Sequence, residues 1–222
     1  GVRRKILPRL LESPGRTLLK TPSSPYFSNS REVYGAMNII LVGYRCTGKT
    51  AAGRSLAARL GVPFYDTDEL IARREGRTVD EIVAAQGWPA FRELERAVIG
   101  DLAGTDGSVI ALGGGAVLDT RNVESLRGNG LFVWLCAAAH VIAERMESDP
   151  ASGAQRPSLK GKASTMEVNE ILAEREPLYR RLADLAVDTT ATGVEGVAEA
   201  ICTGLGERFR QAERAGNGKE KK

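Results

Sequence analysis

The chain has 222 residues, enough for one substantial domain or two very small ones. Its 42% hydrophobic and 27% charged residues are typical of a globular protein, while only 5% aromatic residues argue against a surface of stacked rings for single-stranded nucleic acid. A net charge of +3 is small for a nucleic-acid-binding protein, and no apolar run reaches the ~18 residues that span a bilayer. We therefore expect no nucleic-acid partner and no membrane partner.

Cysteine and histidine usage favours a cytoplasmic protein without a zinc site or a disulfide framework. The three cysteines, Cys46, Cys136 and Cys202, are odd in number and far apart, so they offer no ligand spacing and indicate reducing surroundings. His140 is the only histidine, which excludes a metal centre built from several histidines.

The two ends of the chain differ in composition from the rest. Residues 1–36 carry seven Lys or Arg against two Glu, with four prolines, a serine cluster and no sustained hydrophobic period. We predict a basic, disordered extension, with Met37 as a candidate natural start; an Arg- and Ser-rich transit peptide is the alternative. Residues 214–222 are predicted to form a polar tail, so the folded domain is expected to span residues 37–213.

Between these ends, short apolar runs alternate with helical stretches. Buried strands are predicted at residues 38–42, 62–65, 108–112, 131–136 and 185–188. Helices are predicted at 50–60, from 68 to about 103 with breaks near Gly76 and Gly87, after the third and fourth strands, and at 194–210. The alternation predicts an α/β fold with a five-stranded parallel sheet and helices on both of its faces.

The first strand runs into a complete phosphate-binding motif. Residues 43–50 read Gly-Tyr-Arg-Cys-Thr-Gly-Lys-Thr and match G-x-x-x-x-G-K-[ST] between a predicted strand and a predicted helix. Backbone N–H groups and the helix dipole attract phosphates there, Lys49 adds a charge for the β- and γ-phosphates, and the Thr50 hydroxyl can bind Mg²⁺. The motif predicts a nucleoside triphosphate site, with Lys49 as an exposed loop side chain that supports no core.

Two carboxylates follow the second predicted strand. Alternate residues of a strand share a face, so Asp66 and Asp68 are expected to point together from the edge where open α/β sheets bind ligands. One would support Mg²⁺ or its waters, and the other would accept hydrogen bonds from a substrate hydroxyl. The alternative is a structural role, in which Asp68 caps a helix that starts at Glu69.

Three glycines, Gly113, Gly114 and Gly115, follow the third predicted strand. They permit close backbone approach and expose N–H groups to a small anionic or hydroxylated ligand, whereas a plain tight turn needs only one or two glycines. Arg92 lies three residues before Glu95, so the two side chains can orient each other on one helical face. Arg156 lies in a helix-poor stretch, residues 148–164, that has the character of a mobile lid.

These motifs, in this order, resemble the shikimate kinases, which are small phosphate-loop kinases of the nucleoside monophosphate kinase-like type. The resemblance runs from Met37 to about Leu205 and rests on the phosphate loop together with Phe-Tyr-Asp-Thr-Asp (64–68), Phe-Arg-Glu-Leu-Glu (91–95), Leu-Gly-Gly-Gly-Ala (112–116), Arg156-Pro157 and Arg-Glu-Pro-Leu-Tyr (175–179). It implies transfer of phosphate from ATP to the 3-hydroxyl of shikimate, giving shikimate 3-phosphate and ADP on the way to chorismate and the aromatic amino acids. Mg²⁺ would be the cofactor, and we expect a monomer.

The resemblance also implies roles for individual residues. Acceptor-binding residues would be Asp68, Arg92, Gly113, Gly114, Gly115 and Arg175, with the two arginines on the carboxylate and Asp68 on the ring hydroxyls. Nucleotide-binding residues would be Gly43, Arg45, Cys46, Thr47, Gly48, Lys49, Thr50, Ala51, Arg145 near the adenine, and the lid residue Arg156. Lys49, Asp68 and Arg156 would be catalytic, and Thr50 would bind Mg²⁺ with support from Asp66.

The chain departs from the family pattern in the phosphate loop and near the adenine. Cys46 stands where many relatives carry glycine, and residues 189–193 lack the arginine that some members have. Two alternatives stay open. A kinase for another polyol, such as gluconate, would share the loop and the fold. It would have less need of two arginines that bind a ring carboxylate. A kinase-like regulatory protein without catalysis would commonly have lost Lys49, Thr50, Asp66 or Asp68.

Overall fold

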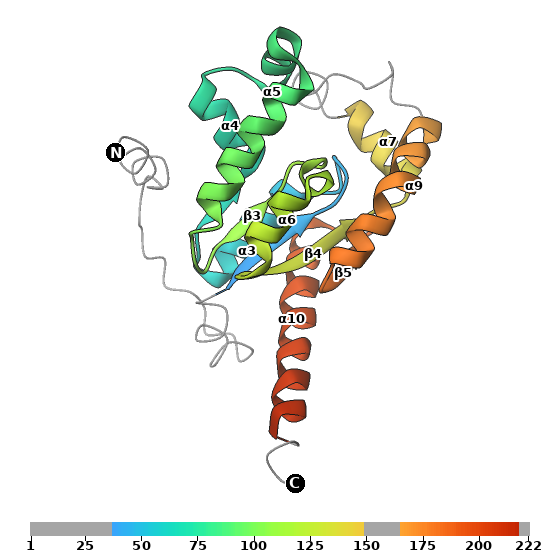
Figure 1. The fold of residues 1–222 in the computed structure, drawn as a ribbon. Helices are drawn as coiled ribbons and strands as arrows, with labels where there is room; N and C mark the ends of the chain where they lie inside the picture. Colours follow the sequence, from blue (N-terminus) through green and yellow to red (C-terminus); the bar gives the residue numbers. More distant parts are fainter. Residues whose placement is uncertain (1–36, 149–164, 218–222) are drawn as a thin grey trace, which may run out of the picture.

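The structure is a computed structural model that describes residues 37–148 and 165–217, with side chains described as far as residue 211 (Figure 1). The basic extension at 1–36, the last residues from 218 onward and nearly all of the predicted lid, residues 149–164 with Arg156, lie outside the described residues.

One sheet of five parallel strands forms the centre of the domain, in the order β2-β3-β1-β4-β5. The strands are β1 (Asn38–Val42), β2 (Phe64–Asp66), β3 (Val109–Ala111), β4 (Gly130–Cys136) and β5 (Leu185–Asp188). At the centre of the sheet, Ile40 of β1 lies opposite Ile110 on one side and Phe132 on the other. Every residue of β1 is buried, as expected for a parallel strand covered on both faces. The predicted fold class is confirmed.

The second strand begins at Phe64, two residues later than its predicted start at 62. The Val62 N–H donates to the Ala57 carbonyl and so still belongs to the end of the preceding helix. Pro63 has no N–H to give to a strand ladder, although its carbonyl accepts from the Val109 N–H. Helix-end hydrogen bonds therefore displace the strand toward Asp66.

Helices cover the two faces of the sheet, and successive β1 residues alternate between them because strand side chains have a period of two. On one face, α3 (Lys49–Leu60) and α10 (Val194–Asn217) pack on Ile39 and Leu41. On the other face, α4 (Thr67–Glu75), α5 (Val79–Leu102) and α6 (Thr120–Arg127) pack on Ile40 and Val42. Figure 1 shows α10 running away from the sheet; it continues beyond its predicted end at residue 210, into the predicted polar tail.

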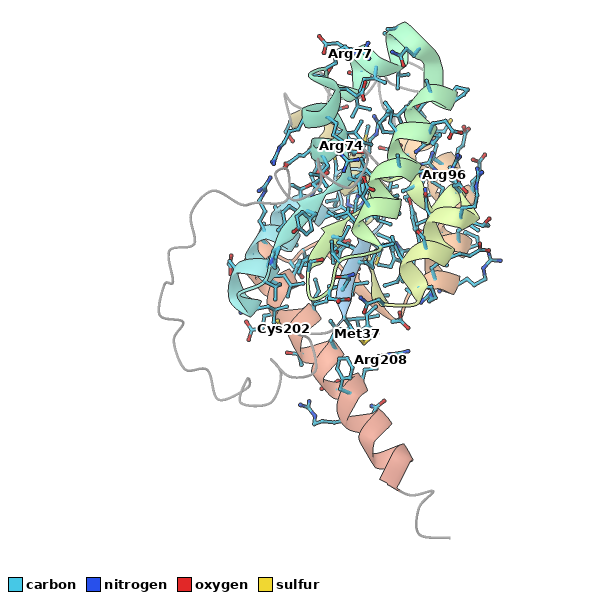
Figure 2. All side chains as sticks on the ribbon, turned by 60° about the vertical axis from the view of Figure 1, so that its left-hand side comes forward. Met37, Arg74, Arg77, Arg96, Cys202 and Arg208 are labelled. Carbon is cyan, nitrogen blue, oxygen red and sulfur yellow. The ribbon has the colours of Figure 1, made fainter. Side chains whose placement is uncertain are left out.

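Both predicted breaks in the helical stretch from 68 to 103 are present. Gly76 has φ 64° and ends α4, and Thr78 starts α5 through a capping box with Glu81. Inside α5, Gly87 has φ 79°, which interrupts the helix just before Pro89. Figure 2 shows Arg77, in the turn between α4 and α5, near one end of the molecule, and Arg208 partway along α10.

A third packing region joins the phosphate loop to α7 (Ala139–Ser148) and α9 (Thr165–Leu182). Tyr44 of the loop is buried there against Ile142 of α7 and Val168 of α9. The two helices pack on each other and flank residues 149–164 in the sequence. The loop is thus fixed to the helices that lead into and out of the predicted lid.

Asp119 connects α5 to α6 and gives the first prediction. Asp119 caps α6 by accepting from the Arg121 N–H, and it also accepts from the Arg121 side chain and from the Arg96 guanidinium, the latter at 2.9 Å. These hydrogen bonds, chiefly that of the Arg121 side chain, lower the pKa of the Asp119 carboxyl from 3.8 to about 2. A carboxylate with a depressed pKa stabilises the fold above its unfolded pKa, and this contribution is lost on acidification. We expect Asp119→Asn to lower the melting temperature at pH 7, by an amount that shrinks between pH 4 and pH 2.

Thermal unfolding of both proteins from pH 2 to pH 7 tests this expectation. Glu124→Gln, at an exposed carboxylate of the same helix, is the matched control and should follow the wild type at every pH. A difference between Asp119→Asn and wild type that stays constant across the range would contradict the proposed linkage.

Candidate active site

The segments that carry the predicted site residues meet at the carboxyl edge of the sheet. Residues 43–48 follow β1, residues 67 and 68 follow β2, residues 112–115 follow β3, and Thr189 follows β5. All of the strands are parallel, so these segments leave the sheet at the same edge, where open α/β sheets bind ligands.

The phosphate loop contains three residues with a positive φ, namely Gly43, Cys46 and Gly48. Gly48 has φ 87° and directly precedes α3, whose first turn therefore has its backbone N–H groups at the loop. Among the residues that the structure describes, Cys46 is the only non-glycine with a positive φ, 59°. This is a conformation that glycine adopts without steric cost. The loop accepts the Cβ of Cys46 in this conformation.

Lys49 is not the exposed loop side chain that the sequence suggests. It is only 9% exposed, and its ammonium donates to the Gly43 and Tyr44 carbonyls at 2.9 and 2.7 Å. The ammonium thereby satisfies two carbonyls at the start of the loop. Lys49 therefore supports the loop, in addition to the phosphate-binding role predicted from the sequence.

Thr50 and Asp66 come together as predicted, but the local structure differs from the expected pair of carboxylates on one strand. The Thr50 hydroxyl donates to Asp66 at 2.7 Å. The other Asp66 oxygen accepts from the Asp68 and Glu69 N–H groups, so Asp66, not Asp68, caps α4. Asp68 lies in the first helical turn rather than on the strand. An Asp66 carboxylate beside a threonine hydroxyl supplies the oxygen ligands that Mg²⁺ prefers, so the residues present fit this ion.

The three glycines form a turn into which other groups pack closely. A Cβ at Gly115 would overlap the Arg92 guanidinium, and a Cβ at Gly114 would lie 3.4 Å from the Arg45 backbone nitrogen. None of the three has a positive φ, so close approach is the reason for glycine here. The Gly113 N–H donates to the buried hydroxyl of Thr67 at 2.9 Å, which ties the turn to the start of α4.

Arg92 of α5 packs against this turn and is paired with Glu95, as the helical spacing predicts. Their side chains are 2.5 Å apart, and Glu95 is completely buried. Burial raises the pKa of the Glu95 carboxyl, and the Arg92 guanidinium opposes that rise. The Arg92 guanidinium is also 5.2 Å from the ring of Trp88. Arg92 is therefore held in place by a buried carboxylate, an aromatic ring and a glycine backbone.

Arg175 reaches the same turn from α9. Its guanidinium donates to the Gly114 carbonyl at 3.3 Å and lies 5.7 Å from the Tyr44 ring. The positive charge of Arg175 also opposes the rise in the pKa of Glu95, the partner of Arg92. Two guanidinium groups from different helices thus converge on a glycine turn next to the phosphate loop. This is a suitable arrangement for a small anion with a carboxylate.

Arg145 and Thr189 lie on the other side of the phosphate loop. Arg145 donates to the Cys46 carbonyl at 3.3 Å and to the Thr189 carbonyl at 2.6 Å. Thr189 is buried, and its hydroxyl lies 3.2 Å from both the Thr47 and the Cys136 carbonyls. Arg145, predicted to lie near the adenine, is therefore held between the phosphate loop and the end of β5.

Sequence reasoning missed the roles of Thr67, Tyr179 and Thr189 in joining these segments. Each is a buried polar side chain that bonds a backbone group far away in the sequence. Thr67 and Tyr179 belong to motifs quoted for the family resemblance, but nothing in the sequence shows what their hydroxyls contact. Arg156 lies outside the described residues.

The fold and the site together define a kinase of the phosphate-loop class. The match of residues 45–205 to the family model described as "Shikimate kinase" shows that the chain belongs to the shikimate kinase family. The family assignment predicted from the motifs is confirmed, and the protein is a kinase.

Individual relatives agree with this assignment. A protein named shikimate kinase from Syntrophus aciditrophicus is 49% identical over 172 residues, which cover 74% of this chain and 88% of the relative. The solved structure of shikimate kinase from Acinetobacter baumannii in complex with shikimate matches with a TM-score of 0.71 at 32% identity, over 78% of this chain and 94% of that one. The Aquifex aeolicus shikimate kinase structure gives a TM-score of 0.65 at 31% identity, over 76% and 96%.

Lys49 gives the second prediction. Lys49→Ala should lower the rate of ADP release by orders of magnitude, because it removes the charge predicted to lie beside the β- and γ-phosphates. It should also lower the melting temperature, because the Gly43 and Tyr44 carbonyls lose their donor. Arg54→Ala, at an exposed position on the same helix, is the matched control and should retain turnover. Near-normal turnover by Lys49→Ala would contradict the phosphate role.

Proposed function

We propose that this protein transfers the γ-phosphoryl group of ATP to the 3-hydroxyl of shikimate, with Mg²⁺, through the residues described above. The observation that carries the proposal is the convergence of Arg92 and Arg175 on the glycine turn beside the phosphate loop. A planar guanidinium matches a carboxylate in two parallel hydrogen bonds, and shikimate carries one carboxylate on a ring with hydroxyls.

The nucleotide half of the reaction uses the phosphate loop. Loop N–H groups and the start of α3 would bind the phosphates, and Lys49 would exchange its contacts with loop carbonyls for the β- and γ-phosphate oxygens. Thr50 and Asp66 would hold Mg²⁺, which neutralises charge on the phosphates when bound. Arg145 would lie against the adenine, held there by the Thr189 and Cys46 carbonyls.

The acceptor half uses residues from three separate elements. Arg92 and Arg175 would bind the carboxylate, the backbone of residues 113–115 would form the wall of the site, and Asp68 would orient the attacking hydroxyl. Positioning of this kind supplies much of the catalysis in phosphoryl transfer, because nucleophile and γ-phosphate must be in line. The buried Glu95 supports the acceptor site by fixing Arg92 in one orientation.

The lid contributes predictions that rest on the family resemblance. Arg156 would neutralise charge on the transferring phosphoryl group, and closure of residues 148–164 would keep water from the γ-phosphate. A monomeric state is proposed on the same basis, and a cytoplasmic location on the cysteine usage. No helix among the described residues has both the length and the apolar character needed to cross a membrane.

An acceptor assay tests the proposed function and is our third prediction. ADP release should be fast with shikimate, slow with gluconate and slowest without an acceptor, and the product should carry phosphate on the 3-hydroxyl. Product identification by NMR checks the position. Faster turnover with gluconate would favour the alternative polyol kinase, and no turnover with any acceptor would favour the non-catalytic alternative.

Arg92 gives the fourth prediction. Arg92→Lys keeps the charge but loses the planar fork, so it should raise the shikimate KM with little change in the ATP KM. A charge-assisted hydrogen bond contributes roughly 1.5–3 kcal/mol, which corresponds to about a 10- to 100-fold rise. Arg96→Lys is the matched control, because Arg96 lies one turn further along α5 with a similar exposed fraction but pairs with Glu93 and Asp119. A raised ATP KM with an unchanged shikimate KM would contradict the assignment of Arg92.

A further inference from the structure

Tyr179 of α9 makes a buried contact with the glycine turn. The side chain is 1% exposed, and its hydroxyl donates to the Gly114 carbonyl at 2.6 Å. Its ring stacks on Trp134 of β4, with ring centres 6.1 Å apart, and the Arg180 guanidinium lies 5.6 Å from the Trp134 ring. The ring is thereby fixed on the sheet, so the hydroxyl has little freedom to move away from the turn.

Gly114 also lies against the phosphate loop. A Cβ at this glycine would be 3.4 Å from the Arg45 backbone nitrogen and 3.5 Å from the Gly43 carbonyl oxygen, which are van der Waals contact distances. The carbonyl that accepts from Tyr179 accepts from Arg175 as well, at 3.3 Å. Gly114 is therefore located between α9 and the loop, and its carbonyl has two donors from successive turns of one helix.

We propose that Tyr179 is a positioning residue for phosphoryl transfer, which holds Gly114 between α9 and the phosphate loop and so sets where the acceptor lies relative to the γ-phosphate. This inference rests on the proposed function, in which the glycine turn and Arg175 bind shikimate. Tyr179 acts through Gly114 and contacts neither substrate itself.

The physical reason is that three acceptor-binding elements approach from separate parts of the fold. Arg92 belongs to α5, the glycine turn follows β3, and Arg175 belongs to α9. The Gly114 carbonyl is the point at which α9 and the turn are joined by hydrogen bonds. A shift of the turn along α9 would change the distance between acceptor hydroxyl and phosphate, and in-line transfer depends strongly on that distance. The nucleotide pocket beyond the loop would be unaffected.

Tyr179→Phe tests this inference, because it removes one hydroxyl and keeps the ring on Trp134. Arg175 still donates to the Gly114 carbonyl, so the variant is expected to fold. The shikimate KM should rise about 2- to 12-fold, the range expected for one neutral hydrogen bond, with a lower kcat and an unchanged ATP KM. Tyr65→Phe is the control: it removes the hydroxyl of a half-buried tyrosine on β2 and should leave all three constants unchanged. An unchanged shikimate KM and kcat in Tyr179→Phe would overturn the inference.

A double variant separates positioning from general loss of packing. Tyr179 and Arg175 donate to the same carbonyl, so each one partly compensates for the loss of the other. Arg175→Ala combined with Tyr179→Phe should therefore raise the shikimate KM by more than the product of the two single effects. A rise equal to that product would mean that the two residues act independently, against the inference.

Hydrogen exchange distinguishes failure of this inference from failure of the proposed function, because it needs no substrate. The Ala116 N–H donates to the Gly113 carbonyl within the turn, at 2.9 Å, and should exchange faster in Tyr179→Phe than in the wild type. If the wild type fails to phosphorylate shikimate but the Ala116 N–H still exchanges faster in Tyr179→Phe, the proposed function is wrong, whereas the role of Tyr179 in fixing the turn is supported. If the wild type is active and the exchange is unchanged, only the positioning role of Tyr179 is overturned.

Discussion

The proposed acceptor side of the site depends on a stretch of backbone without side chains at Gly114 and Gly115. The Arg92 guanidinium occupies the volume that a Cβ of Gly115 would fill, and the phosphate loop packs on Gly114. These contacts bring α5, β3, α9 and the loop within reach of one small molecule. Arg92 and Arg175 can share a ligand because the backbone between them takes up so little space.

Two charged groups of the site, Glu95 and Lys49, are buried, and each is matched by a specific partner. Glu95 has no exposed surface and is compensated by Arg92, while the ammonium of Lys49 satisfies two loop carbonyls. Removing one partner of a buried ion pair typically costs 3–5 kcal/mol, much more than losing a surface pair. The site therefore keeps its charged groups in place before any ligand arrives, which lowers the cost of ordering them on binding.

The proposed nucleotide and acceptor halves of the site are organised in a similar way around the phosphate loop. On the nucleotide side, the Thr189 hydroxyl lies between the carbonyls of Thr47 and Cys136. On the acceptor side, the Tyr179 hydroxyl joins α9 to Gly114. In each half, a buried hydroxyl connects elements that are distant in sequence, and the loop stands between the two. The distance between the bound nucleotide and the bound acceptor molecule would thus depend on all the segments at this edge of the sheet.

The sequence by itself determined the parallel sheet, the phosphate loop, the pairing of Arg92 with Glu95 and the family, because these depend on local periodicity and on motifs with fixed spacing. Only the tertiary structure decided that Lys49 is buried against loop carbonyls, that Asp66 rather than Asp68 caps α4, and that Thr67, Tyr179 and Thr189 join the site's segments. Hydrogen bonds between residues 46 to 142 positions apart leave no periodic signal in the sequence, since their geometry exists only after the strands have paired and the helices have packed on them.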